Sequence, residues 1–215
     1  MRIICLSNSF KAGGRCLAGI EINNDNKIGI YKRGPRWIRP VCKTDQEQVP
    51  NNISRNYKYY DLIEFNSDPS YKRTDYQSEN LLIRDNKLKY IGKVNISGPL
   101  SDLCNNNTDK NIFGNISNFV SKIEVNSLKY SLMMIEINKF EVVTVDRYGS
   151  TSPQRRLKFS YHNTIYDLPI TDPIFLQNYE HDNDILRNLN NLFIILSLGV
   201  EFNSKYYKLV ATLLY

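Results

Sequence analysis

The sequence predicts a mostly β protein built as two small β-barrels in tandem. Short apolar runs alternate with polar turn clusters over almost the whole chain, which is typical of short strands. The fifteen tyrosines favour half-buried sheet surfaces, because aromatic side chains pack well on pleated strands. Both halves hold about 100 residues of such strands, a length that suits two small barrels better than one sandwich.

The first half is expected to form short strands that are separated by turns. Pro35 and Pro40 interrupt the extended stretches around them, and the segment 23–27 is a dense turn cluster. Gly13 and Gly14 lie between the first two apolar runs, where we expect both to supply positive φ in a hairpin. The strands are expected at residues 2–8, 15–22, 27–31, 36–42, 59–65 and 79–85.

The alternation weakens in the middle of the chain. Residues 98–121 combine asparagine-rich stretches with spaced apolar positions, which predicts a short helix, a loop and a second helix. We place the domain boundary in this region. The first barrel is expected over residues 1–110 and the second over residues 111–215.

The second half alternates more clearly. We expect strands at 131–137 and 140–145, a hairpin at 155–170 with its turn at His162–Asn163, and strands at 193–202 and 206–215. Apolar residues at i, i+4 and i+7 predict a helix over 184–193. The basic residues of these strands fit ordinary solvent-exposed positions: Arg147, Arg155, Arg156, Lys158, Lys205 and Lys208.

The positive charge is concentrated in one window. The chain has a formal net charge of +6, and residues 31–60 carry seven basic against two acidic side chains, a local excess of +5. A clustered excess of this kind indicates a polyanion partner more strongly than the total charge does. The seven basic residues are Lys32, Arg33, Arg36, Arg39, Lys43, Arg55 and Lys58.

The glycine-bearing loop at residues 11–15 is not a nucleotide-hydrolysis loop. A P-loop needs G-x-x-x-x-G-K-[ST] before a helix, whereas here the order is Lys-Ala-Gly-Gly-Arg before a β-rich run. Two interpretations stay open for the charged side chains of this turn. Lys11 and Arg15 are either solvated, or they lie on a barrel rim that touches a phosphate backbone.

Basic and aromatic residues interleave in two segments. In the first, Trp37 and Arg39 share one face of an expected strand, an arrangement that suits single-strand binding through stacking and phosphate contacts. The alternative places Trp37 in the core, with the arginines beside it in solvent. In the second segment, Tyr57, Lys58 and Tyr59 form either a stacking platform or the start of a strand.

No catalytic or metal-binding constellation is predicted. The four cysteines contain no C-x-x-C pair, and neither histidine stands at ligand spacing. Asp167 and Asp172 raise the alternative of a metal-dependent nuclease, but the position of Asp172 before Pro173 is typical of a turn or a helix N-cap. We therefore expect a protein without enzymatic activity, cofactor or metal. The short apolar runs contain no signal peptide or membrane span, so a cytoplasmic location is expected.

Several segments together resemble a known prokaryotic family, the dual OB-containing domain. The similar stretches are "IICLSNSFKAGGRCLAGIEI", "RWIRPV", "LKFSYHNTIYDLPITDPIF", "LSLGVEF" and "YYKLVATLL". The resemblance implies two OB-type barrels, a nucleic-acid-binding role and association with prokaryotic anti-phage systems. It implies no catalytic residues.

The sequence thus leads to one main hypothesis and one rival. The main hypothesis is a non-catalytic subunit that recognises single-stranded DNA or RNA beside a neighbouring effector protein. The rival is an adaptor that binds a protein partner and never touches nucleic acid, since OB barrels serve both purposes. The expected nucleic-acid contacts are Lys11, Arg15, Lys32, Arg33, Arg36, Trp37, Arg39, Arg55, Tyr57, Lys58 and Tyr59.

Overall fold

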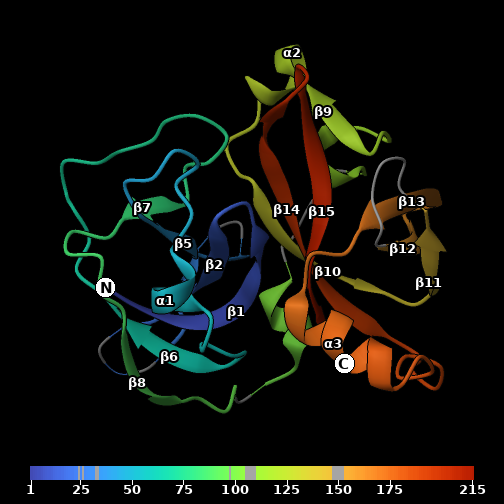
Figure 1. Ribbon diagram of the computed structural model, residues 1–215, viewed down its shortest axis with the longest axis horizontal. Helices are drawn as coiled ribbons and strands as arrows, with labels where there is room; N and C mark the ends of the chain where they lie inside the picture. The colour runs from blue at the N-terminus through green and yellow to red at the C-terminus, as the bar shows by residue number, and fades with distance from the viewer. Residues whose placement is uncertain (24, 26, 32–33, 97, 105–109, 147–152) are drawn as a thin grey trace.

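Strands dominate the structure, which confirms the mostly β prediction. A computed structural model describes residues 1–215 apart from 24, 26, 32–33, 97, 105–109 and 147–152 (Figure 1). Two groups of strands lie side by side, one from each half of the chain. The N-terminus lies at the outer side of the first group, and the C-terminus lies beside α3 in the second.

The first half is built on a curled sheet with the strand order β7-β5-β2-β1-β6-β8 in the described residues. All neighbouring strands in it are antiparallel except β5 and β7. The elements are β1 (Arg2–Lys11), β2 (Gly14–Glu21), β3 (Ile30–Tyr31), β4 (Gly34–Pro35), β5 (Trp37–Val41), α1 (Asn51–Ser54), β6 (Asp61–Glu64), β7 (Asn80–Leu82) and β8 (Lys89–Lys93).

The second half contains two sheets, with the orders β10-β14-β15-β9 and β11-β12-β13 in the described residues. Two 3₁₀ turns, Leu100–Leu103 and Ile112–Gly114, stand in the segment where the sequence predicts two helices. The elements are β9 (Phe119–Ser121), α2 (Lys122–Val125), β10 (Leu132–Ile137), β11 (Phe140–Val145), β12 (Gln154–Tyr161), β13 (Thr164–Pro169), α3 (Pro173–His181), β14 (Leu192–Phe202) and β15 (Lys205–Leu214).

Local turn chemistry closes the hairpins of the second half. His162 and Asn163 have φ values of 45° and 65° between β12 and β13, so the predicted two-residue turn is confirmed. Asn203 and Ser204, with φ values of 52° and 60°, form the same kind of turn between β14 and β15. Two consecutive positive φ values match the right-handed twist of the paired strands.

The predicted helix over 184–193 is wrong. Residues 183–188 form consecutive turns, and β14 begins at Leu192. The side chain of Asp182 accepts a hydrogen bond from the backbone of Asp184, a local bond that competes with helix formation. Ile185 and Leu189 still pack against the core of the second half, so the apolar spacing reflects burial rather than a helix.

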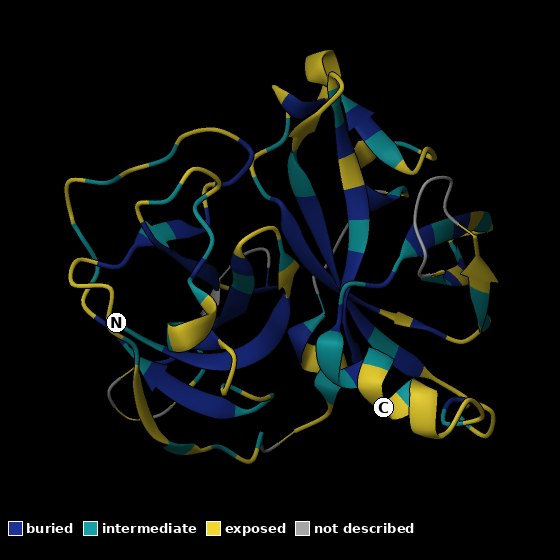
Figure 2. Ribbon diagram, viewed as in Figure 1, coloured by how far each residue is buried: buried dark blue, intermediate teal, exposed yellow. Residues whose placement is uncertain are grey.

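The buried apolar side chains form three clusters. Figure 2 marks the buried segments of the chain in dark blue. One cluster lies within the first half. Another lies in the second half and includes Tyr76. The third, called the shared cluster below, joins both halves through residues such as Ile4, Leu6, Leu132 and Met134. The shared cluster was not expected, because two separate barrels would each bury their own apolar side chains.

Strand β1 explains how the halves come together. Ile3 and Cys5 point into the cluster of the first half, whereas Ile4 and Leu6 point into the shared cluster, so β1 is buried on both faces. Its far end reaches the second half, where the Phe10 N–H donates to the Thr171 carbonyl oxygen at 2.8 Å. The described sheets divide near the middle of the chain, while the boundary between residues 110 and 111 stays a prediction.

Candidate functional site

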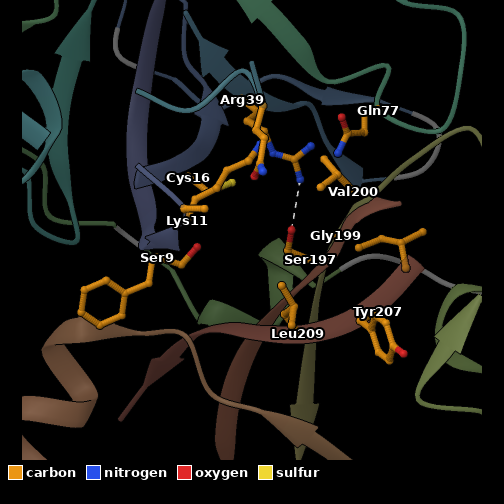
Figure 3. Close-up of a pocket in the computed structure, with 14 residues that line it drawn as sticks. Ser9, Lys11, Cys16, Arg39, Gln77, Ser197, Gly199, Val200, Tyr207 and Leu209 are labelled. Atoms are coloured by element: carbon orange, nitrogen blue, oxygen red, sulfur yellow. Dashed lines mark hydrogen bonds between the residues drawn. The ribbon is translucent and has the colours of Figure 1, made fainter. Parts of the chain in front are cut away.

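A cavity of about 250 Å³ lies where the β1–β2 hairpin meets β14 and β15 (Figure 3). Both halves contribute to its wall. The first half supplies Ser9, Phe10, Lys11, Cys16, Arg39 and Gln77, and the second supplies Ser197, Leu198, Val200, Tyr207 and Leu209. Clefts between packed units are common ligand sites, so this cavity is the first place to look for function.

The hairpin reaches the cavity because of its two glycines. Gly13 has φ +76°, the left-handed conformation that glycine adopts without steric cost. Gly14 does not share this conformation, contrary to the expectation from the sequence. It is needed for space, since a Cβ there would lie 2.4 Å from the carbonyl oxygen of Val49. The predicted turn is confirmed, and close backbone packing fixes its position.

Arg39 is the most buried charged side chain at the cavity, with 2% of its surface exposed. Its guanidinium donates to Asn80 Oδ1 at 2.9 Å, to Ser131 Oγ at 2.8 Å and to Ser197 Oγ at 3.2 Å. Figure 3 shows the guanidinium reaching toward Ser197 across the space between the halves. The Nε atom is buried and has no hydrogen-bond partner among the described residues.

Lys11 approaches the cavity from the end of β1. Burial lowers the pKa of its ammonium group below 10.5. The charge of Arg39 adds to this shift, whereas Cys16 and Glu47 oppose it. Glu47 is a carboxylate near this region, but it accepts hydrogen bonds from Tyr71, Arg73 and Asn80 instead. Within the described residues neither Lys11 nor Arg39 forms a salt bridge with a carboxylate.

Two exposed aromatic side chains line the cavity. Phe10 is 52% exposed and Tyr207 is 36% exposed, although both line the cavity. Tyr207 also lies 6.1 Å from the ring of Phe119 and 6.4 Å from the ring of Phe202, centroid to centroid. These four rings are called the aromatic face below.

Cations accompany the aromatic face. The guanidinium carbon of Arg15 lies 4.4 Å from the ring centroid of Phe10, and the ammonium of Lys205 lies 4.3 Å from that of Phe119. Both distances are within the range of a cation–π contact. The Nε and Nη1 atoms of Arg15 are buried and have no hydrogen-bond partner in the described part of the chain. The face therefore presents rings and positive charge together.

The structure brings together three of the residues predicted from the sequence. Lys11 and Arg39 line the cavity, and Arg15 lies on the ring of Phe10. Arg39, however, is an interior residue that joins the halves, and not the exposed strand residue that the pattern indicated. Lys32 and Arg33 lie outside the described residues.

The other residues of the basic window lie elsewhere. Arg36 is exposed and forms a salt bridge of 3.0 Å with Glu21. Trp37 is 6% exposed and belongs to the shared cluster, as the core alternative anticipated. Arg55 and Lys58 are exposed at and after the end of α1, away from the cavity wall.

The predicted stacking platform of tyrosines has another role. The hydroxyl of Tyr57 donates to the carbonyl oxygen of Leu88 at 2.8 Å, and its ring packs on the cluster of the first half. The hydroxyl of Tyr59 donates to Asp172, and burial raises its pKa. Because both side chains are held by contacts within the protein, neither ring forms an open surface for bases.

The site residues predicted from the sequence do not include Phe10, Gln77, Ser197 or Tyr207. In the structure, burial along Tyr206, Tyr207 and Lys208 alternates as buried, exposed and buried, which turns Tyr207 outward. The sequence contains no such signal, because the buried neighbour on one side is a lysine. The remaining residues come from separate segments that only the tertiary structure brings together.

The two carboxylates considered for a nuclease are engaged in structural contacts. Asp167 forms a salt bridge of 2.7 Å with Arg156. Asp172 caps α3 by accepting hydrogen bonds from the backbone of Ile174 and Phe175, as its position before Pro173 predicts. Among the described residues no group of three His, Cys, Asp or Glu side chains could hold a metal ion.

No helix in the described ranges is long and apolar enough to cross a membrane. No curated protein matches the chain. The model of one family, described as the dual OB-containing domain, matches residues 1–213, which is nearly the whole sequence. The curled sheet of the first half and the strand-rich second half are consistent with this match. The chain therefore belongs to the dual OB-containing domain family.

Proposed function

We propose that this protein binds single-stranded DNA or RNA without catalysis, as the recognition subunit of a prokaryotic anti-phage system. The observation that carries this proposal is the aromatic face with the cations Arg15 and Lys205 on its rings. Bases stack on exposed rings and cations follow the phosphates, which is the general mode of single-strand recognition by OB folds. The membership in a dual OB family supports the same conclusion.

The placement of the aromatic face favours one continuous strand that crosses both halves. Phe10 belongs to β1 in the first half, whereas Phe119, Phe202 and Tyr207 belong to the second. Phe10 and Tyr207 line one cavity, so a strand that stacks on both rings passes over Lys11. The aromatic face thus has enough rings for more than one base to stack within a single site.

Two further parts of the proposal rest on other observations. The absence of catalysis is supported by the structural contacts of Asp167 and Asp172, because carboxylates held by Arg156 and by backbone N–H groups are poorly placed to bind metal ions. A role beside an effector protein is supported by the association with anti-phage systems that the family resemblance implies.

Replacing a ring of the aromatic face is expected to weaken binding without changing its salt dependence. Phe10→Ala and Tyr207→Ala should each cost about 1–3 kcal/mol for a lost stacked base. Fluorescence anisotropy with labelled single-stranded DNA and RNA measures the effect. Tyr90→Ala is the matched control, since Tyr90 is an exposed ring on β8 outside the cavity wall. Equal losses in all three variants would contradict the assignment.

Replacing a cation of the face is expected to change the salt dependence. Wild-type affinity should fall by roughly two decades or more between about 50 and 200 mM salt, because phosphate contacts release counterions. Arg15→Ala should lower the slope of log affinity against log salt by about one. Arg36→Ala is the control, since Arg36 is paired with Glu21.

An unchanged slope in Arg15→Ala would remove this residue from the interface. Absence of binding beyond that of a generic basic protein would replace the proposal with the adaptor hypothesis. The same samples, incubated with Mg²⁺ and separated on a denaturing gel, test the catalytic part. Intact strands are expected, and cleavage that is lost in Asp167→Ala would revive the nuclease hypothesis.

A further inference from the structure

The cavity contains two positive charges and lacks a counter-charge within the described residues. The partners of Arg39 are the uncharged oxygens of Asn80, Ser131 and Ser197. Burying a cation without an anionic partner costs several kcal/mol in a protein interior. An uncompensated guanidinium beside a second cation is therefore the signature of a site that an anion completes.

No nearby carboxylate forms a salt bridge with Lys11 or Arg39 in the described part of the chain, although the charge of Glu47 acts on Lys11. Glu47 is held by Arg73 and Asn80, and Glu79 accepts hydrogen bonds from the backbone N–H groups of Ser131 and Leu132. The side chain of Asn80 links Arg39 to Glu47, since its Oδ1 accepts a hydrogen bond from Arg39 and its Nδ2 donates one to Glu47. The hydrogen bonds thus orient the guanidinium, with Asn80 between it and Glu47 and the Ser131 hydroxyl between it and Glu79.

We propose that this cavity binds the phosphate monoester of a nucleotide, held between Lys11 and Arg39. The choice of a nucleotide rests on the proposed function, whereas the choice of a phosphate rests on the cavity alone. A phosphate monoester carries about −1.5 to −2 charges near neutral pH, which balances two cations better than a carboxylate or a backbone diester does. The ligand is either a free mononucleotide or the phosphorylated end of a strand.

The remaining wall fits the rest of such a ligand. The guanidinium of Arg39 and the ammonium of Lys11 line the cavity and supply N–H donors for phosphate oxygens, and Ser9 and Gln77 add polar groups on the side of the first half. Leu198, Val200 and Leu209 add apolar side chains from the second half. The exposed ring of Tyr207 at the mouth is placed to cover a base.

Cys16 provides a direct probe of occupancy, because it lines the cavity and is partly exposed. The protein is treated with iodoacetamide, and the alkylation of each cysteine is followed by mass spectrometry. Saturating AMP is expected to slow alkylation of Cys16 at least about tenfold, as a bound ligand blocks access. Cys104 is also partly exposed but does not line the cavity, so its rate is the internal reference. Adenosine, which lacks the phosphate, should not protect Cys16.

The Lys11→Met variant tests whether the positive charge of Lys11 binds the phosphate, because it removes the charge and nearly keeps the length of the side chain. It should weaken AMP protection by about tenfold or more, since a hydrogen bond to a charged group is lost. Lys58 is an exposed lysine away from the cavity, so AMP should protect Cys16 in Lys58→Met as well as it does in the wild type. An unchanged Cys104 rate and melting temperature show that each variant is folded.

Oligonucleotides with a 5′-phosphate, a 3′-phosphate or only hydroxyl ends show whether the ligand is a free mononucleotide or the phosphorylated end of a strand. Protection by a phosphorylated strand alone assigns the site to strand ends, and protection by AMP alone assigns it to a free nucleotide. Both outcomes support the proposal. Equal protection by AMP and adenosine, equal protection by hydroxyl-ended and phosphorylated strands, or no protection by any of them overturns it. Anisotropy with the hydroxyl-ended strand tests the proposed function separately, since stacking on the aromatic face needs no terminal phosphate.

Discussion

Gly19→Ala is expected to lower the free energy of unfolding by about 3 kcal/mol or more. A Cβ at this position would lie 2.2 Å from the carbonyl oxygen of Ile4 and 2.9 Å from its carbonyl carbon. Both atoms belong to the backbone of β1, so no side-chain rotation relieves the contact. Gly19 pairs with Cys5 beside the register shift of the β1–β2 ladder, and the two central strands would have to separate.

Gly92→Ala is the matched control for this prediction. Gly92 also lies in a strand of the first-half sheet, but a Cβ there would meet no atom within 4 Å. Its stability should stay within about 0.5 kcal/mol of wild type or rise slightly, because alanine restricts the unfolded chain. Thermal melting should separate the two variants by on the order of 10 °C. Similar melting temperatures would show that β1 and β2 move apart without cost.

Local chemistry in the sequence was sufficient for most strands and for one hairpin turn and one helix cap, whereas β8 and β9 were not predicted. The turn at His162–Asn163 and the cap at Asp172 were predicted because each depends on neighbouring residues alone. The helix over 184–193 failed because burial alone can produce apolar residues at i, i+4 and i+7. Periodicity reports which side chains are buried, and it reports a helix only when the backbone has no competing local bonds.

The burial of charged residues could not be predicted from local patterns. The three side-chain partners of Arg39 lie 41, 92 and 158 residues further along the chain. No window of the sequence contains them together. For this reason Arg39 looked like one more exposed cation in a basic segment, although it is the residue that joins the halves at the cavity.

Lys208 shows the same limit in β15. A solvent-exposed side chain was expected from the sequence, but the structure buries it completely. Its ammonium donates to the carbonyl oxygens of Ile112 and Asn115 at 2.6 and 2.8 Å, and to Asn115 Oδ1 at 2.8 Å. Burial lowers its pKa to about 7. The acceptors come from a 3₁₀ turn and the residue after it, far away in sequence.

Asp172→Ala is expected to lower the free energy of unfolding by about 3–5 kcal/mol. The side chain accepts hydrogen bonds from the N–H groups of Ile174, Phe175 and Leu213 and from the hydroxyl of Tyr59. Because the carboxylate is buried, alanine would leave these donors without water to replace it. The loss combines the cap of α3, the anchor of β15 and a link between the two halves.

Tyr59→Phe removes the hydrogen bond between the halves and leaves the cap of α3 intact, so it measures the contribution of that bond alone. It removes one donor to Asp172 and keeps the ring in the shared cluster, so a loss of about 1–2 kcal/mol is expected. Urea unfolding of the single and double variants measures the coupling, and the effects should not add, because both remove the same bond. Asp184→Ala is the control, since Asp184 is exposed beside Arg187 and should change stability by less than about 0.5 kcal/mol. Additive losses for Tyr59 and Asp172 would show that the bond between them contributes nothing to the association of the halves.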